Sequence, residues 1–551
     1  MYLYEQHNKH MPTVFTQKIF IVKKENINLK TVGIVAEYNP FHNGHKYQIK
    51  QIRRQTNADN IVVVMSGNFV QRGGFAWTDK NLRTQMAIEC GADFVFELPT
   101  VFACASAEIF ALGAVTLLDS LGFVDEICFG SEAGNLEILE KISSILNSND
   151  YIKELELYLK EGLAFPVARE QYLKKCMPEY SNILPTLLKQ PNNILGIEYI
   201  KALKKINSHI KPITIKRIDN GYHSTNLDST TTLSDNTYNL NKNKQLQNTS
   251  KIVCCCSNSK ENVYWSDKSN NKFSSASAIR TSFEKLNFFS DITEKEAALN
   301  KIIEHVPEAV INILKNNLTR FPASNSLFSD MLYFKILSLK KENLPLDIYS
   351  DVSPELSDRI YNNLHKYKDF DDFANILKTK QYTHTRITRA LTHILLDIKK
   401  EDMDLFISQL CHENYNKPTK TSATNYIDTN IKTCMQPVIY ARLLGMNKNK
   451  SHILRNINNI PVITKVANAD KSFEKFLSQS QNDITTSKST IITSGCENIQ
   501  TSSIIDEQNS QYIKQLQKMF NYDLFATDLY RFCTGNNVPD EYRAGIYIYL
   551  T

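Results

Sequence analysis

The stretch Gly33-Ile-Val-Ala-Glu-Tyr-Asn-Pro-Phe-His-Asn-Gly-His45 decides the fold of this chain. Its first residues belong to an apolar run, Val32 to Ala36, which predicts a buried strand. Asn39-Pro40 is a turn signal, and His42 and His45 then open a helical stretch. A strand that turns into a helix directs backbone N–H groups and the positive end of the helix dipole at one point. Imidazoles three residues apart share one helical face, so we predict an anion site in which both histidines reach one phosphate.

Strand and helix patterns alternate from Thr31 to about Leu146, because short apolar runs are followed by amphipathic stretches. The predicted strands are Thr31–Ala36, Ile61–Met65, Phe94–Leu98 and Val124–Phe129, and the predicted helices are His45–Gln55, Asp79–Cys90, Ser106–Leu121 and Leu136–Leu146. Four βα units in a row predict a doubly wound parallel sheet, a Rossmann-like α/β fold. Ligands of such sheets bind beyond the carboxyl ends of the strands. The loops that leave these ends should therefore converge: Glu37–Gly44, Ser66–Gly74, Pro99–Ser106 and Gly130–Glu132.

Changes in composition divide the rest of the chain. For residues 1–30 the composition predicts a disordered or loosely attached extension. Residues 31–290 predict the α/β domain, which includes a helical stretch at 151–210 that breaks at 191–196, a further strand at 212–218 and a polar insertion at about 223–272. Residues 291–551 predict a second, mainly α-helical domain with polar insertions at about 413–430 and 478–509.

The bulk composition is that of a globular protein. Of 551 residues, 42% are hydrophobic and 22% charged, and the formal net charge is +6, a mild excess that permits a nucleic-acid partner without requiring one. The 11 cysteines form no Cys-x-x-Cys pair and no cluster with zinc spacing, so we expect no metal site and a reducing, cytoplasmic compartment. No run approaches the roughly 18 apolar residues of a membrane span.

Three further motifs carry groups that suit a phosphate or a nucleoside. Arg72, in the loop at 66–74, offers a guanidinium to anionic oxygens, although a solvated loop is the alternative. Gly130 leaves bare backbone at a strand end, where an adenine or ribose fits, or it forms a simple turn. Ser275-x-Ser277-x-x-Arg280 places two hydroxyls and a guanidinium at a helix start, which is either a phosphate-binding element or an N-cap beside an ordinary arginine.

The two-histidine stretch resembles the His-x-Gly-His signature of adenylyl- and cytidylyl-transferases. In those enzymes the histidines donate hydrogen bonds to the phosphates and stabilise charge while a nucleophile attacks the α-phosphate. The Ser275–Arg280 motif is similar to the Ser-x-Thr-x-x-Arg element that binds triphosphate in the same enzymes, with Ser277 in place of the threonine. The two motifs together favour a nucleotide site over two unrelated local structures.

A basic cluster in the helical half interleaves with aromatic residues. Lys378, Lys380, Arg386 and Arg389 surround Tyr382 in the sequence. Such a pattern suits an RNA backbone and splayed bases, although charge clusters are more often solvated helix faces.

Taken together, the motifs resemble those of the bacterial tRNA(Met) cytidine acetate ligases. In the first half these are Glu37-Tyr-Asn-Pro-Phe-His-Asn-Gly-His45, Met65-Ser-Gly-Asn-Phe-Val-Gln-Arg-Gly73, Glu97-Leu-Pro99, Phe129-Gly-Ser-Glu132, Asn193-Ile-Leu-Gly-Ile-Glu-Tyr199, Ile215-Lys-Arg217 and Ser275–Arg280. In the second half they are Tyr382-Thr-His-Thr-Arg-Ile387, Tyr440-Ala-Arg-Leu-Leu-Gly445 and Ala526-Thr-Asp-Leu-Tyr530. The resemblance runs from about Val32 to Tyr530, interrupted by the three polar tracts.

The resemblance implies an enzyme that activates acetate with ATP, releases pyrophosphate, and transfers the acetyl group to N4 of the wobble cytidine of elongator tRNA(Met). It implies ATP as substrate, with Mg²⁺ accompanying the triphosphate. It implies catalytic roles for His42, His45, Arg72 and Arg280. It implies ATP contacts for Val35, Glu37, Tyr38, Asn39, Pro40, Phe41, His42, Asn43, Gly44, His45, Gly130, Asn193, Arg217, Ser275 and Ser277. Residues 31–290 would then be the nucleotidyltransferase-like ATP-binding domain and residues 291–551 the tRNA-binding domain, with Lys378, Lys380, Arg386 and Arg389 as RNA contacts.

Two other classes of function use parts of the same pattern. A small-molecule nucleotidyltransferase that makes an adenylylated or cytidylylated cofactor would use the two-histidine motif but would need no large basic helical half. An RNA-binding protein with a vestigial fold would not need both histidines and Arg280 together.

Overall fold

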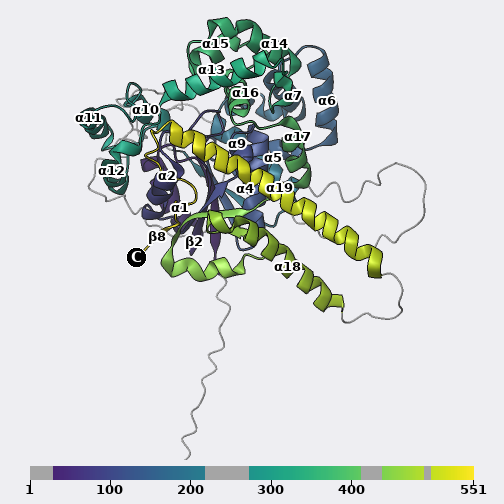
Figure 1. Ribbon diagram of the computed structural model, residues 1–551. Coiled ribbons are helices and arrows are strands. Elements are labelled where there is room, and N and C mark those ends of the chain that lie inside the picture. The colour runs from purple at the N-terminus through teal and green to yellow at the C-terminus, as the bar shows by residue number, and fades with distance from the viewer. Residues whose placement is uncertain (1–28, 218–271, 411–436, 489–497, 551) are drawn as a thin grey trace, which may run out of the picture.

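The computed structural model describes residues 29–217, 272–410, 437–488 and 498–550 (Figure 1). The predicted N-terminal extension and the polar tracts predicted at 223–272 and 413–430 lie outside these residues, apart from positions 29, 30 and 272.

A mostly parallel sheet forms the centre of the described part of the chain. Its eight strands are β1 (Thr31–Ala36), β2 (Asn60–Ser66), β3 (Phe94–Leu98), β4 (Glu126–Ser131), β5 (Lys211–Lys216), β6 (Ala441–Asn447), β7 (Val462–Ile463) and β8 (Tyr547–Tyr549). The order is β5-β4-β1-β2-β3-β6-β7, and β8 pairs with β6. All neighbours are parallel except β3 and β6. The predicted doubly wound parallel sheet is confirmed.

Helices cover both faces of the sheet and form a cap above it (Figure 1). In the first half they are α1 (Asn43–Thr56), α2 (Lys80–Glu89), α3 (Thr100–Ala103), α4 (Ala107–Ser120), α5 (Leu136–Leu146), α6 (Asn149–Lys160), α7 (Phe165–Cys176), α8 (Leu184–Leu187), α9 (Pro191–Lys205), α10 (Ala276–Thr281), α11 (Ile292–Ile302) and α12 (Glu308–Lys315). In the second half they are α13 (Asn325–Lys341), α14 (Pro354–Asn363), α15 (Phe370–Leu377), α16 (His384–Leu395), α17 (Lys400–Leu410), α18 (Ala469–Lys488) and α19 (Asn498–Phe532). Short 3-10 turns lie at Pro178–Tyr180, Leu318–Arg320, Leu346–Ile348, Leu364–Lys366, Lys448–Asn456 and Val466–Asn468.

Strand β2 shows why the sheet must be covered on both sides. All seven of its residues are buried, which is typical of a central parallel strand. Val62 and Val64 belong to one hydrophobic core, while Val63 and Met65 belong to the other, as the alternation of side chains along a strand requires. The first core extends without interruption to Phe328 and Ile387 in the helical cap. The cap therefore packs directly on the sheet layer.

Local sequence signals explain the element boundaries well. Asp79 and Ser106 cap α2 and α4 through their side chains, as predicted. The predicted break at 191–196 is wrong, because Pro191 occupies the first turn of α9 instead of ending a helix. This is the position where the missing N–H of proline costs least.

Two features of the second half were not expected. Strand β6 returns from the helical half to pair with β3, so the sheet contains strands from both ends of the chain. Helices α18 and α19 also continue into the tract predicted as a polar insertion at 478–509. The boundary at residue 290 stays a prediction.

Candidate active site

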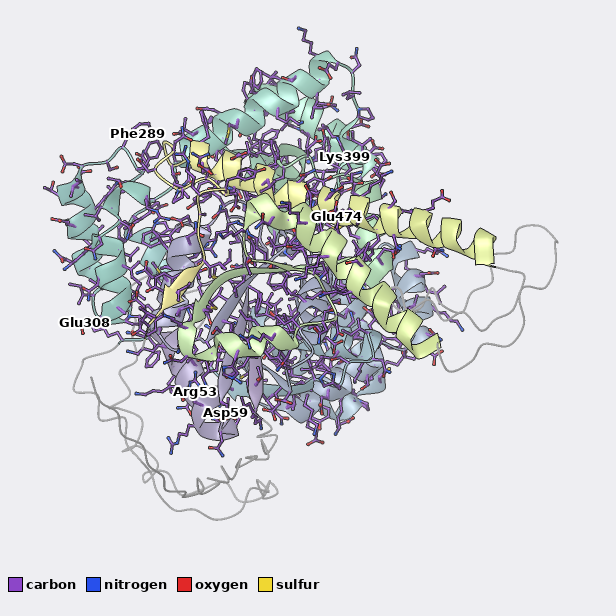
Figure 2. All side chains as sticks on the ribbon, turned by 60° about the horizontal axis from the view of Figure 1, so that its bottom comes forward. Arg53, Asp59, Phe289, Glu308, Lys399 and Glu474 are labelled. Carbon is purple, nitrogen blue, oxygen red and sulfur yellow. The ribbon has the colours of Figure 1, made fainter. Side chains whose placement is uncertain are left out.

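A cavity of about 1140 Å³ opens where the strands end, between the sheet and the helical cap. Its floor comes from the segments after β1, β2, β4 and β5, and its upper wall from α13, α15 and α16. The predicted convergence of loops at the carboxyl ends of the strands is therefore confirmed for the loops after β1, β2 and β4, whereas no residue of the predicted loop at 99–106 lines the cavity. Figure 2 labels Arg53 and Asp59, which precede β2. They lie near the amino ends of the strands, away from α13.

The two histidines of the opening motif form one unit at the start of α1. His42 is the N-cap, and its Nδ1 accepts a hydrogen bond from the backbone N–H of Gly44 at 3.1 Å. The Nδ1 of His45 accepts from the backbone N–H of His42 at 3.2 Å. Because each Nδ1 is an acceptor, each neutral ring carries its proton on Nε2. Both residues line the cavity, so both supply an Nε2–H donor there.

The surroundings keep these imidazoles neutral. Burial, together with the positive charges of Arg217 and Arg280, lowers the pKa of His42 to about 3. Burial also holds the pKa of His45 well below its usual range, with His42 and Arg217 adding to the effect. Neutral donors let the site accept a polyanion while the neighbouring guanidinium groups supply the positive charge.

Arg280 locks the turn between β1 and α1. Its Nη1 donates to the carbonyl oxygen of Asn39 at 2.6 Å, and its Nη2 donates to Ser277 Oγ at 3.2 Å. The other side of the turn is fixed because the Oδ1 of Asn39 accepts from the backbone N–H of Trp77 at 2.7 Å. Ser275 caps α10 through its Oγ, so the N-cap interpretation of that serine is correct. Ser275, Ser277 and Arg280 nevertheless all line the cavity.

Gly130 and Arg217 come together at the ends of β4 and β5. A Cβ added at Gly130 would lie 3.2 Å from Cγ of Arg217, tighter than ordinary packing. The absent side chain thus leaves space for the arginine stem. Both residues line the cavity, and Arg217 adds a third guanidinium to those of Arg72 and Arg280.

The loop that carries Arg72 spans two parts of the chain. The carboxylate of Glu37, at the end of β1, accepts from the backbone N–H of Gln71 at 2.9 Å. On the other side, the Oγ1 of Thr388 in α16 donates to the carbonyl oxygen of Arg72 at 2.5 Å. Glu37 and Arg72 both line the cavity.

Most of the predicted site residues meet in this cavity, and four lie behind its surface. Those that line it are Val35, Glu37, Tyr38, Asn39, His42, Gly44, His45, Arg72, Gly130, Arg217, Ser275, Ser277 and Arg280. Pro40, Phe41, Asn43 and Asn193 are buried and do not line it.

Two of these four residues, Asn43 and Asn193, make side-chain hydrogen bonds that hold neighbouring segments together. Asn43 donates to the carbonyl oxygens of Lys272 at 3.0 Å and Glu304 at 2.8 Å. Asn193 accepts from the backbone N–H of Ala133 at 3.0 Å and donates to Gln190 Oε1 at 2.7 Å. Both amides are thus occupied within the protein. Direct contacts between these residues and ATP stay predictions.

The upper wall of the cavity was not anticipated from the sequence. It includes Asn325, Ser326 and Ser329 from α13, Asp371 from α15, and Asp369, the residue that caps α15. Hydrophobic periodicity predicts such helices but not which of their ends face a distant sheet. Lys189 and Asn192 also line the cavity. Pro191, which begins α9, was available in the sequence as a sign of a helix start, and helix starts often border a ligand.

The predicted basic cluster divides into two groups. Lys378 and Lys380 are exposed, and the guanidinium of Arg386 lies over the ring of Tyr382 at 4.9 Å from its centroid. Arg389 is buried, and its Nε donates to Asp351 at 2.9 Å. Lys378 and Lys380 are thus accessible to solvent, Arg386 is partly buried, and Arg389 is engaged within the fold.

Neither a metal cluster nor a membrane span is found in the described ranges. No group of three or more His, Cys, Asp or Glu side chains there is arranged to hold a metal ion. None of the helices in the part of the chain that the structure describes has the length and hydrophobicity to cross a membrane.

Comparison with known proteins agrees with this site. The family model described as HIGH Nucleotidyl Transferase matches residues 29–253 and 238–417. The tRNA(Met) cytidine acetate ligase of Clostridium perfringens (strain ATCC 13124) is 35% identical over 451 residues, which cover 80% of this chain and 91% of that protein. The enzyme of the same name from Thermoanaerobacter sp. (strain X514) is 34% identical over 515 residues, which cover 92% of this chain and 96% of that protein.

Solved structures give the same picture of the fold. The apo crystal structure of Thermotoga maritima TmcAL has a TM-score of 0.67 at 25% identity and covers 95% of this chain and 100% of that chain. The structure of the same protein bound with alpha-thio ATP has a TM-score of 0.67 at 24% identity, with the same coverage. With its Rossmann-like nucleotidyltransferase fold, its two-histidine cavity and its similarity to these enzymes over most of its length, this chain belongs to the tRNA(Met) cytidine acetate ligase family.

Proposed function

We propose that this chain is an ATP-dependent ligase that acetylates N4 of the wobble cytidine of elongator tRNA(Met). In the first step an acetate oxygen attacks the α-phosphorus of ATP, and pyrophosphate leaves with the electron pair of the broken P–O bond. In the second step the N4 amine attacks the acetyl carbon, AMP leaves, and the amine loses a proton. The products are N4-acetylcytidine, AMP and pyrophosphate.

The observation that carries this proposal is the pair of neutral imidazoles. His42 and His45 each present an Nε2–H to a cavity that Arg72, Arg217 and Arg280 also line. A carboxylate attacking a triphosphate needs both negative charges balanced, and charge that develops on the phosphate oxygens is stabilised by donors already in place. The proposed roles are catalysis for His42, His45, Arg72 and Arg280, and nucleotide binding for the other predicted residues that line the cavity.

Binding of ATP is supported by the Thermotoga structure that holds alpha-thio ATP. We expect Mg²⁺ to arrive with the triphosphate, because this ion is commonly held by one or two carboxylates and substrate phosphates rather than by a protein cage. Glu37 lines the cavity, but its Oε1 already accepts from Gln71. We therefore do not assign Glu37 as a ligand of this ion.

The acceptor in this proposal follows from the names of the relatives, which specify tRNA(Met). Residues 31–290 would form the ATP-binding part, and residues 291–551 the tRNA-binding part, with Lys378, Lys380 and Arg386 available for RNA phosphates. A tRNA substrate favours a cytoplasmic location.

The test is acetate-dependent exchange of pyrophosphate into ATP, followed by transfer of labelled acetate to tRNA(Met). We expect exchange only with acetate, and label at the wobble cytidine after nuclease digestion. Exchange that ignored acetate and required a nucleoside monophosphate or phosphopantetheine would indicate a cofactor-making nucleotidyltransferase instead. Acetate-dependent exchange without label in tRNA(Met) would keep the first step and reject this acceptor.

A further inference from the structure

Helix α16 holds the backbone of the Arg72 loop at two neighbouring points. Besides the bond from Thr388 Oγ1 to the Arg72 carbonyl at 2.5 Å, the backbone N–H of Gly74 donates to Thr392 Oγ1 at 2.8 Å. Thr388 and Thr392 lie one helical turn apart, and both are buried. The two hydroxyls therefore form hydrogen bonds to successive peptide groups of the loop from the same face of the helix.

The hydrogen bonds of Thr392 link the loop to the helix backbone. Its hydroxyl donates to the carbonyl oxygen of Thr388 at 2.8 Å while it accepts from Gly74. Threonines within helices commonly bond back to the preceding turn, which by itself needs no function. Thr392 does this and also accepts from the loop, so both hydrogen-bonding capacities of its hydroxyl are used.

The loop lies directly on the helix. At Gly73, which has φ +82°, an added Cβ would be 2.5 Å from the carbonyl carbon of Thr388. No side chain fits between the two backbones at this separation. Glu37 holds the opposite side through the N–H of Gln71 at 2.9 Å. The peptide group before Gln71 is thus held by the end of β1 and the peptide group after Arg72 by α16, so the two bonds bracket Gln71 and Arg72.

We infer that Thr388 and Thr392 are positioning residues for adenylate formation, which act by holding the loop so that Arg72 meets the triphosphate. This inference rests on the proposed function, because it takes Arg72 to contact the reacting phosphates. Neither threonine lines the cavity. Their effect must therefore pass through Arg72.

The threonines also connect the two parts of the chain that the reaction uses. Helix α16 presents Arg386 near its N-terminus and grips the Arg72 loop at Thr388 and Thr392. Helix α16 thus both sets the geometry of the first step and bears a proposed tRNA contact.

The experiment compares Thr388→Val, Thr392→Val and Thr388→Ser in acetate-dependent ATP–pyrophosphate exchange. Valine keeps the volume of threonine and removes the hydroxyl, whereas serine keeps the hydroxyl. We expect each valine variant to lower kcat at least about tenfold with little change in the KM for ATP, because small misplacements of catalytic groups are costly. We expect Thr388→Ser to stay near the wild-type rate. Thr84→Val is the matched control, because Thr84 is a buried helical threonine whose hydroxyl, among the described residues, bonds to the carbonyl of Lys80 alone, at 2.8 Å.

A double-mutant cycle with Arg72→Ala decides whether the threonines act through Arg72. In that background Thr388→Val should cause no further loss of exchange. An equal loss in both backgrounds, or full exchange by both valine variants, would overturn the inference. If Thr388→Val fails to fold, as judged by thermal melting, Thr392→Val provides the same cycle. Absence of acetate-dependent exchange in the wild type would instead reject the proposed function, and an unaffected Arg72→Ala protein would reject the role of Arg72.

Discussion

The imidazole ring of His42 stacks on that of His45, with ring centroids 3.7 Å apart and planes inclined by 24°. Two charged rings at this separation would repel each other strongly. Arg217 and Arg280 add positive charge beside them. The stacking therefore belongs to a pair of neutral donors, and the arginines supply the net charge that a triphosphate requires.

This relationship predicts different outcomes for two substitutions of His45. Asparagine can replace the Nδ1 acceptor but not the Nε2–H, whereas the glutamine amide reaches toward the Nε2 position. We expect His45→Asn to lower kcat for exchange by about 10²–10³-fold, the usual cost of one missing donor to developing charge. His45→Gln should retain more activity. Equal and full activity of both variants, measured by pyrophosphate exchange, would remove the catalytic role of His45.

The same pair predicts that the nucleotide-free protein loses stability in mild acid. The pKa of His42 is about 3 in the fold, against an ordinary value of 6.5, and that of His45 is also depressed. Between these values the unfolded chain binds more protons than the folded chain, so stability rises with pH and falls as pH drops below about 6.5. Each histidine steepens this dependence by up to about 1.4 kcal/mol per pH unit. Denaturant unfolding from pH 7 to 5 should show a shallower slope for the His42→Asn/His45→Asn variant, and an unchanged slope would contradict this account.

Local signals predicted the floor of this site from the sequence, whereas its upper wall depends on long-range contacts. The β1 strand matches its prediction at both ends, and the turn and capping residues around His42 follow from nearby sequence. By contrast, Thr388 lies 316 residues from Arg72. Nothing in the periodicity of α16 indicates which loop its hydroxyls meet, because an amphipathic pattern specifies a buried face but not its partner. The same limit explains why β6 was missed, since a strand from the far half of the chain carries no mark of the strand it pairs with or of its register.

The basic cluster predicts two distinct phenotypes. Lys380 is exposed and Arg386 lies over Tyr382, so Lys380→Glu/Arg386→Glu should weaken tRNA binding at least about tenfold and reduce its salt dependence. Exchange of pyrophosphate without tRNA should stay at the wild-type rate. Filter binding at several salt concentrations tests the first expectation, and undiminished tRNA affinity would exclude this surface as an RNA contact.

Arg389 should behave differently from its neighbours because Asp351 engages it at 2.9 Å. Arg389→Gln leaves that carboxylate without its cation, and we expect a loss of about 1–3 kcal/mol in the free energy of unfolding. Denaturant titration measures this loss. A variant with wild-type stability but weakened tRNA binding would instead assign Arg389 to the RNA surface.

A buried ionic network joins the sheet to the C-terminal end of the described chain. Lys80 donates to both oxygens of Glu97, at 2.7 and 2.8 Å, and also pairs with Glu541. Arg442 of β6 pairs with Glu541 and lies 3.3 Å from Glu97. All four side chains are buried, so two cations balance two carboxylates within the core. Burial opposes ionisation of Glu541, but Lys80 and Arg442 outweigh it and hold the pKa of this carboxylate far below its usual range.

This network predicts that Glu541→Gln is strongly destabilising although the residue lies outside the cavity. The substitution removes one negative charge and leaves an excess positive charge in the core, which typically costs about 3–5 kcal/mol. Glu474→Gln is the control, because Glu474 is exposed on α18 (Figure 2) and its loss should change the free energy of unfolding by less than about 0.5 kcal/mol.

Because Lys80 begins α2 and its backbone N–H donates to Asn68 at 2.9 Å, the network also holds the start of the loop that carries Arg72. Glu541→Gln protein that remains folded should therefore exchange pyrophosphate more slowly. Wild-type stability, measured by urea unfolding, would show that the four charges are not coupled as their contacts indicate.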